Sequence, residues 1–249
     1  MTGSGHLLFG TATAVMVYSL CHVENTPENV ATALGLAAVS ALAPDLDEPS
    51  STLSQRLAWL PKGKTARLLT VMASVAFISW CFANLPTIVA LLFTGIATSF
   101  TTMFLMKQDL ARKVTLAVVG AVFVYVGMKH SWGFAMGIGF FIACAPWTKH
   151  RTVTHTIWAT ILWAFICWDF EKHLQVDGMS LVGIFAYVSH IVADSLTKSK
   201  VKPFWPIRLR FGIPFIRVGS KGGVVAEHAI GIVMLVLSLA VYTAVYGIV

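Results

Sequence analysis

Long apolar stretches, separated by short polar connections, run through the whole chain. Hydrophobic residues make up 57% of the 249 residues and charged residues only 12%, about half of the roughly 25% that is usual in soluble domains. Inside a bilayer, backbone polar groups must be satisfied within the segment that carries them, so apolar stretches of this kind fold as helices. The sequence therefore predicts an all-α, polytopic membrane helix bundle that forms a single domain over residues 1–249.

The apolar stretches can be drawn as nine segments. A helix that crosses a bilayer needs about 20 residues, and several of these segments are nearer to about 15. We therefore expect about eight or nine membrane segments, of which the shorter ones are tilted, half-spanning or buried in the bundle. They run over roughly 6–22, 30–44, 66–84, 86–106, 114–128, 132–147, 155–168, 180–197 and 228–248.

Basic residues are concentrated in alternate connections. Nearly all of the 18 Lys and Arg residues lie in the connections 45–67, 107–113, 148–154 and 198–227. The connections between them contain only Lys129 and Lys172. Because Lys and Arg are retained on the cytoplasmic side of a membrane, this alternation predicts a cytoplasmic N-terminus.

Histidine and aspartate pairs lie at the ends of segments on this same predicted side. His190 and Asp194 are four residues apart in an apolar segment, so their side chains share one face of a helix. Asp45 and Asp47 follow directly after Pro44, and carboxylates at this spacing in a turn suit a divalent cation. Ionisable groups within membrane segments are costly and mark functional sites.

The stretch HRTVTH supplies the third group, with His150, Arg151 and His155. His155, at the start of a segment, is a candidate metal ligand. Arg151 can hold a phosphate through two parallel hydrogen bonds, and His150 can act as a general acid or base. His6 and Glu227 begin segments on the same predicted side and are further candidate ligands.

Each of these groups also has a purely structural explanation. His190 and Asp194 could form a structural hydrogen bond between helices. Asp45 and Asp47 could belong to a solvated loop, and Arg151 could serve only to keep its connection on the cytoplasmic side. Their shared side and depth favour a joint site, and a mixed nitrogen and oxygen donor set favours zinc or manganese, as one or two ions. The candidate ligands are His6, Asp45, Asp47, His155, His190, Asp194 and Glu227.

A basic and aromatic segment, residues 198–227, follows the last of these pairs. It interleaves Lys and Arg with aromatic residues such as Phe204 and Trp205. Such a composition at a membrane surface fits anionic lipid head groups better than it fits nucleic acid, since prolines and glycines break it and the membrane tethers it. We interpret it as a cytoplasmic interfacial segment.

In this order the motifs identify a family. The sequence resembles the YdjM-like family of LexA-regulated, inner-membrane metal-dependent hydrolases, through GHLLFG, APDLDEPSS, HRTVTHT, SHIVADSLTKSKVKPFWP and AEH. The resemblance extends from His6 to Glu227; Glu48 stands where the family commonly has histidine, and Thr156 where it has serine. The helix with His190 and Asp194 is also similar to one in zinc-dependent phospholipase C.

The resemblance implies a bacterial inner-membrane hydrolase of the SOS response. Its site would comprise His6, Asp45, Asp47, His150, Arg151, His155, His190 and Asp194. We expect a phosphoester of a membrane lipid or polyprenyl phosphate as substrate, cleaved at the cytoplasmic face, and no nucleic-acid partner. Two alternatives stay open, a transporter of a metal ion or an anion and a non-catalytic membrane protein that a metal stabilises.

Overall fold

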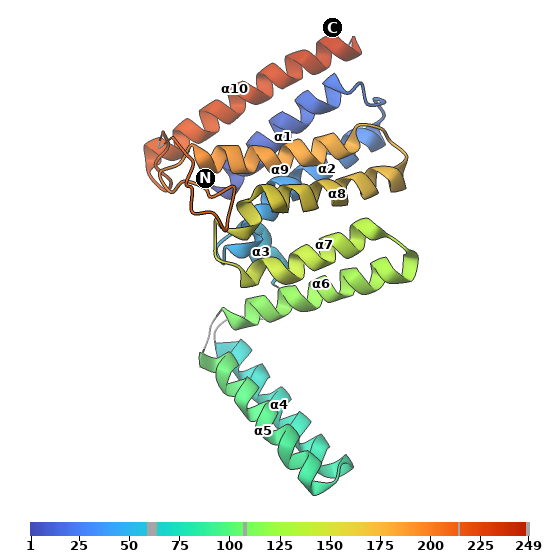
Figure 1. Ribbon diagram of the computed structural model, residues 1–249, viewed down its shortest axis with the longest axis vertical. Coiled ribbons are helices and arrows are strands. Elements are labelled where there is room, and N and C mark those ends of the chain that lie inside the picture. The colour runs from blue at the N-terminus through green and yellow to red at the C-terminus, as the bar shows by residue number, and fades with distance from the viewer. Residues whose placement is uncertain (59–63, 107–108, 214, 248–249) are drawn as a thin grey trace.

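The computed structural model describes residues 1–58, 64–106, 109–213 and 215–247 (Figure 1). Over these residues it is helical and contains no β-strand, which confirms the predicted all-α class. The α-helices are α1 (Gly3–Leu20), α2 (Pro27–Leu42), α3 (Thr52–Leu57), α4 (Lys64–Asn84), α5 (Thr87–Met106), α6 (Leu110–His130), α7 (Gly133–Cys144), α8 (Ile157–Leu174), α9 (Met179–Ser195) and α10 (Lys221–Tyr246). Short 3-10 turns are η1 (Ala43–Asp47), η2 (Ala145–Trp147) and η3 (Val153–His155).

Each apolar segment drawn from the sequence corresponds to one helix, and α3 is an additional short helix in the connection after η1. Within the described residues, three helical stretches are long and apolar enough to cross a membrane: Pro27–Asp47, Leu110–His130 and Lys221–Tyr246. Shorter apolar helices cover Leu68–Asn84, Thr87–Thr102, Gly133–Trp147 and Met179–Ser195. Of the basic residues used to orient the chain, Lys62 and Lys107 lie outside the described residues.

One helix start differs from the prediction. The side chain of Ser220 accepts a hydrogen bond from the backbone N–H of Gly223 and caps α10, because unpaired N–H groups at a helix start need an acceptor. The helix therefore begins at Lys221, before the predicted residue 228. As a result, Glu227 and His228 lie within α10, and only the earlier part of segment 198–227 is a connection.

The helices pack as an antiparallel bundle. Helix α1 packs against α2, α9 and α10, while α7 packs between α6 and α8 (Figure 1). Figure 1 shows the hairpin of α4 and α5 extending away from the rest of the bundle. Large apolar side chains on this hairpin, such as Trp80 and Ile88, are exposed, as suits helices that face lipid.

The elements that carry the predicted site meet at one end of the bundle. The starts of α1 and α10, the end of α9, and the turns η1 and η3 all lie there (Figure 1). The remaining histidines, His22, His130 and His173, lie at or next to the helix ends of the opposite side. At that opposite end, Asp169 accepts a hydrogen bond from the first turn of α7, from Phe134 N at 2.6 Å.

Helices α6 and α7 approach each other backbone to backbone. A Cβ atom added at Gly120 would lie 2.4 Å from the carbonyl oxygen of Gly139, and one added at Gly139 would lie 2.5 Å from that of Gly120. No side chain can fit between these carbonyls, and small residues at such contacts are typical of helices packed in membranes.

We expect Gly120→Ala to destabilise the protein by about 1–3 kcal/mol, the usual cost of overpacking. The matched control is Gly35→Ala in α2, where an added Cβ meets nothing within 4 Å. The control should be neutral or slightly stabilising, since alanine favours helix more than glycine does. Thermal unfolding in detergent measures both, and equal stability of the two variants would contradict the close approach.

Candidate metal centre

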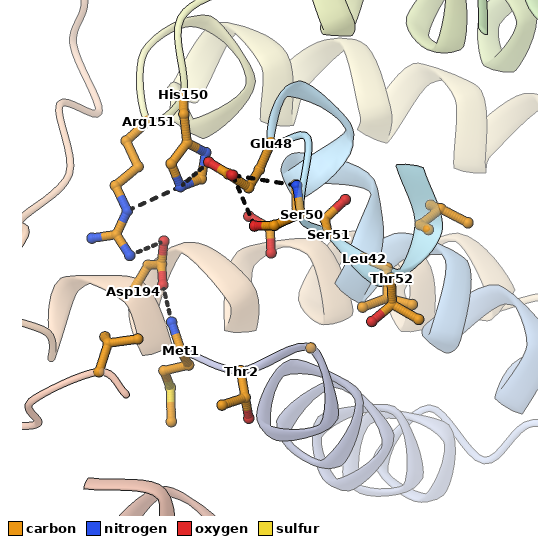
Figure 2. Close-up of a pocket in the computed structure, with 14 residues that line it drawn as sticks. Met1, Thr2, Leu42, Glu48, Ser50, Ser51, Thr52, His150, Arg151 and Asp194 are labelled. Carbon is orange, nitrogen blue, oxygen red and sulfur yellow. Dashed lines mark hydrogen bonds and ion pairs between the residues drawn. The ribbon is translucent and has the colours of Figure 1, made fainter. Parts of the chain in front are cut away.

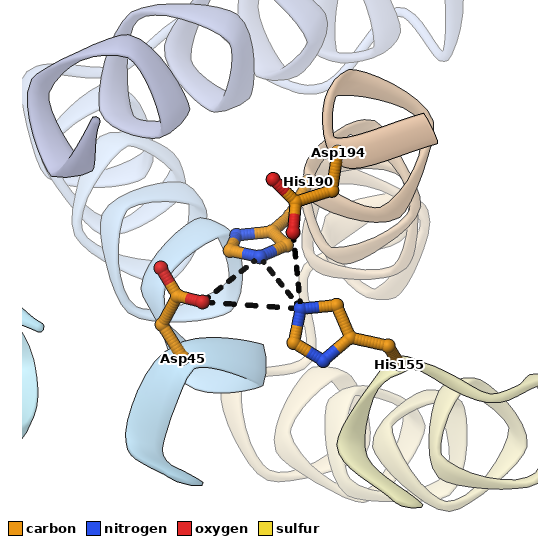
Figure 3. A group of neighbouring side chains, drawn as sticks. All are labelled: Asp45, His155, His190 and Asp194. Atoms are coloured by element: carbon orange, nitrogen blue, oxygen red, sulfur yellow. Dashed lines mark hydrogen bonds and ion pairs between the residues drawn. The ribbon is translucent and has the colours of Figure 1, made fainter. Parts of the chain in front are cut away.

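The central group of the site is formed by four side chains from three parts of the chain (Figure 3). Asp45 comes from η1, His155 from η3, and His190 and Asp194 from α9. One ligand atom from each residue lies within 4.8 Å of all the others. Both histidines and Asp194 are buried, and Asp45 is 14% exposed. The structure thus brings together the pairs that the sequence predicted separately.

Hydrogen bonds determine which nitrogen of each histidine faces the group. His190 Nδ1 lies 2.6 Å from the carbonyl oxygen of Ala41, which can only accept, so Nδ1 carries the proton. The hydroxyl of Thr154 donates to Asp47 Oδ2 at 2.7 Å and is therefore left to accept from His155 Nδ1 at 3.0 Å. In a neutral imidazole the second nitrogen is then an acceptor. Both histidines therefore present an Nε2 lone pair to the same point.

The resulting geometry fits a metal ion. The two Nε2 atoms are 3.3 Å apart, and two lone pairs at this distance repel each other unless a cation lies between them. Asp45 Oδ1 is 3.4 Å from His190 Nε2, and Asp194 Oδ2 is 3.4 Å from His155 Nε2. Ligands around tetrahedral zinc, with bonds of about 2.0–2.2 Å, are separated by about 3.3–3.6 Å. A set of imidazole and carboxylate donors at these separations is a zinc-like or manganese-like set.

His6 lies beside this group. Its ring stacks on that of His190, with centroids 3.6 Å apart and planes at 12°. Its Nε2 is 3.4 Å from Asp194 Oδ1 and 4.0 Å from Asp45 Oδ2. Its Nδ1 is buried and has no hydrogen-bond partner among the described residues. Buried polar atoms are rarely left unpaired; His6 thus borders two carboxylates of the central group through Nε2, while its buried Nδ1 has no described partner.

Asp47 connects a second histidine to the centre. Its Oδ1 is 2.8 Å from His150 Nδ1, while its Oδ2 accepts from Thr154. Asp47, His150 and His155 form a second group whose ligand atoms lie within 4.8 Å of one another. Both oxygens of Asp47 already take part in hydrogen bonds, so its contacts are those of a residue that orients His150 and, through Thr154, His155.

The pKa values of the two histidines next to Asp47 are shifted in opposite directions. Partial burial lowers the pKa of His150, but the hydrogen bond and charge of Asp47, with Asp45 and Glu48 nearby, outweigh this and raise it above 6.5. Complete burial lowers the pKa of His155 despite the nearby negative charges of Asp47 and Asp194, and the neighbouring His190 lowers it further. His155 is therefore held in the neutral form that binds metals, while His150 is suited to taking up a proton.

Arg151 lies across the mouth of the site. Its Nη2 is 3.0 Å from Asp194 Oδ2 and its Nη1 donates to Thr197 Oγ1 at 3.0 Å, while its Nε points to His150 Nε2 at 3.4 Å. The backbone of Arg151 has φ of 60°, a region that residues other than glycine rarely occupy. Arginine has five N–H donors, so two remain for a ligand.

These residues border a cavity of about 300 Å³ (Figure 2). Asp45, Asp194, His150 and Arg151 line one part, and polar residues of the connection after η1, including Glu48 and Ser51, line another. In Figure 2 the guanidinium of Arg151 lies between His150 and Asp194. The volume suits a small ligand or the head group of a larger one.

Glu227 does not join the group, which differs from the predicted ligand set. Its carboxylate accepts from the backbone N–H of Thr2 at 3.3 Å and from the hydroxyl of Thr2. Its neighbour His228 lies 3.2 Å from Ser4 Oγ. Because α10 begins early and packs along α1, Glu227 faces the start of α1, where a negative charge complements unpaired N–H groups.

Residues outside the predicted set also hold the centre. Thr154 lies inside the HRTVTH motif, next to the candidate ligand His155, and this position is the one sequence feature that could indicate its role. Arg112 belongs to the basic connection 107–113, which was used only to predict the orientation of the chain in the membrane. In the structure it is buried, and its Nη1 donates to Leu46 O at 3.1 Å and to Ser54 Oγ at 2.8 Å. Nothing in its local sequence marks this role, because Leu46 lies far from it in the chain.

Substitution of one central ligand should remove the metal. We expect His190→Ala to lose bound zinc or manganese, because three ligands with a vacant buried position bind weakly. Elemental analysis of the purified protein measures this, beside His130→Ala, which changes a histidine at the opposite end. Equal metal content in the two variants would contradict the assignment.

Thr154 should affect metal affinity without being a ligand. We expect Thr154→Val, which keeps the shape but removes the hydroxyl, to weaken metal binding by about 10–100-fold, the usual effect of losing a partner that orients a ligand. Competition with a chelator gives the affinity. Thr160→Val in α8, whose hydroxyl bonds only to Thr156 O, should leave it unchanged, and a similar loss in both variants would speak against the role of Thr154.

Comparison with known proteins identifies a family. A family model described as YdjM inner membrane protein matches residues 1–249. Searches of curated proteins and of solved structures found no match.

Proposed function

The chain belongs to the family of YdjM inner membrane proteins, and on this premise we propose that it is a metal-dependent hydrolase that cleaves a phosphoester of a lipid-like substrate. The proposal rests on the Nε2 atoms of His155 and His190, which lie 3.3 Å apart with their lone pairs facing the same point. Carboxylates flank these atoms, and Arg151 lines the adjoining cavity. Membrane location follows from the family and the apolar helices. Zinc or manganese, as one or two ions, is the cofactor that suits these donors.

His155, His190, Asp45 and Asp194 would hold the ion, with His6 completing the shell. An ion held there supplies Lewis acidity towards a phosphoryl oxygen and lowers the pKa of water. The imidazoles would present their Nε2 lone pairs to the ion, because Ala41 O and Thr154 Oγ1 hold the opposite nitrogens.

His150 would act as the general base. Its Nδ1 hydrogen-bonds to Asp47 at 2.8 Å, so its Nε2 carries the lone pair, which would take a proton from the attacking water in place of the 3.4 Å contact with Arg151 Nε. The charge of Asp47 stabilises the imidazolium that forms, and the raised pKa of His150 favours uptake of this proton.

Arg151 would hold the phosphate. The guanidinium is fixed by Asp194 and Thr197, so its two remaining N–H groups have a set direction towards the cavity. A fixed guanidinium lowers the entropic cost of orienting the phosphoryl group. The apolar part of the substrate would remain among the helices and lipid, while the reaction takes place at the end of the bundle.

The distribution of Lys and Arg supports a cytoplasmic position for this end of the bundle. The proposed topology has the N-terminus in the cytoplasm and eight or nine membrane segments. The long helices α2, α6 and α10 would cross the bilayer fully, and shorter ones would tilt or lie inside the bundle.

A transporter is less well supported. Within the described residues, both groups of side chains able to hold a metal ion share His155 and lie at the same end of the bundle. An ion path needs polar groups at mid-depth and at the opposite face. A non-catalytic metal site is the remaining alternative, and activity separates it from the hydrolase.

We expect the metal-loaded protein to hydrolyse at least one member of a panel of phospholipids and polyprenyl phosphates. His150→Gln should lower kcat by about 10²–10⁴-fold, as expected for loss of a general base, with bound metal unchanged. His22→Gln, at the opposite end, is the matched control. Phosphate or head-group release measures turnover, and a loaded protein inactive on the whole panel would sink the hydrolase proposal.

A further inference from the structure

The connection between α9 and α10 is strongly basic. We call residues 198–213 and 215–220 the basic strap. It contains Lys198, Lys200, Lys202, Arg208, Arg210 and Arg217 and no acidic residue. All but Lys202 are classed as exposed, and none of the six forms an ion pair within the described part of the chain. The strap therefore presents uncompensated positive charge.

The strap is folded against the end of α9. Ile213 N donates to Ser195 O at 2.9 Å, and Ile216 N donates to Leu196 O at 2.9 Å. These bonds satisfy carbonyls that a helix end leaves unpaired. Val201 pairs with Phe211 in an antiparallel bridge, and Val201 and Ile216 are buried. The strap is thus a fixed element.

Its outward side chains are apolar as well as basic. Ile213 and Phe215 are 70% and 73% exposed, and Ile207 and Leu209 alternate with Arg208 and Arg210. Exposed apolar side chains of this size mark an interaction surface. Large aliphatic groups among bases suit the boundary between lipid head groups and acyl chains. Bases and exposed aromatic groups could also contact a nucleic acid, but the strap belongs to an inner membrane protein, which favours lipid as the ligand.

The strap also borders the metal centre. Thr197, directly before it, accepts the hydrogen bond from Arg151 at 3.0 Å, and Val218 of the strap lines the 300 Å³ cavity. A head group bound on the strap would therefore lie at the rim of the cavity.

We propose that the basic strap is a binding surface for anionic phospholipid head groups, next to the cavity of the metal centre. Its use as a substrate-capture element rests on the proposed hydrolase function. The binding itself does not, because it requires only the strap.

The test measures lipid binding to the purified full chain in detergent, with EDTA present so that no hydrolysis takes place. Calorimetric titration with dioctanoyl phosphatidylglycerol and with dioctanoyl phosphatidylcholine compares an anionic with a zwitterionic head group. One basic residue near an anionic surface contributes about five-fold in affinity. The double variant Arg208→Gln, Arg210→Gln should therefore lose about 30-fold towards phosphatidylglycerol and little towards phosphatidylcholine.

The matched control is Lys129→Gln, Lys172→Gln, which removes the same charge at the opposite end of the bundle and should keep the preference. Three results would overturn the proposal: no preference for phosphatidylglycerol in the parent protein, an equal loss in the control, or displacement of the lipid by a 20-nucleotide single strand of DNA at low concentration. If binding follows the strap but no lipid is hydrolysed, the surface stands and the hydrolase function fails.

Discussion

The carboxylate of Asp194 is buried at the end of an apolar helix, and a charge in such a place must be compensated. Arg151 Nη2 lies 3.0 Å from it, the amino group of Met1 lies 2.7 Å away, and His6 Nε2 approaches to 3.4 Å. These partners come from separate segments. Satisfying one charge therefore draws the start of α1, the η3 region and the end of α9 to a single place, and the centre forms where they meet.

Asp47 plays the corresponding part on the other side of His155. One of its oxygens holds His150, and the other holds Thr154, which in turn orients His155. The proposed base and a proposed metal ligand thus depend on the same carboxylate. A displacement of η1 would affect both, which makes the position of this 3-10 turn critical for the chemistry.

Arg112 holds that turn in place. Its guanidinium spans from α6 to Leu46 O in η1 and to Ser54 in α3, and Asp109 pairs with it at 2.7 Å. A buried guanidinium that satisfies a backbone carbonyl is costly to replace, because both partners would be left unpaired. The centre is therefore supported by α6 as well as by the helices that carry its ligands.

The sequence by itself determined the helices and the end of the bundle at which the candidate site residues lie. Apolar length is a local property, so each predicted segment became one helix, and the four-residue spacing alone placed His190 and Asp194 on one face. The charge alternation grouped the candidates at one end, and the structure gathers all of them there. The same alternation included His6 among the candidates, and the resemblance to a family agreed with it.

Only the tertiary structure decided the roles within that group. The direction of each imidazole lone pair depends on its hydrogen-bond partner. For His190 the partner is the backbone carbonyl of Ala41, in another helix. For His155 it is the hydroxyl of Thr154, a residue type that does not by itself indicate such a role. Glu227 shared the predicted side with the ligands but faces Thr2, because it lies within α10 on the face that packs along α1. Spacing along the chain determines which residues share a helix face, whereas the packing of helices determines what that face contacts.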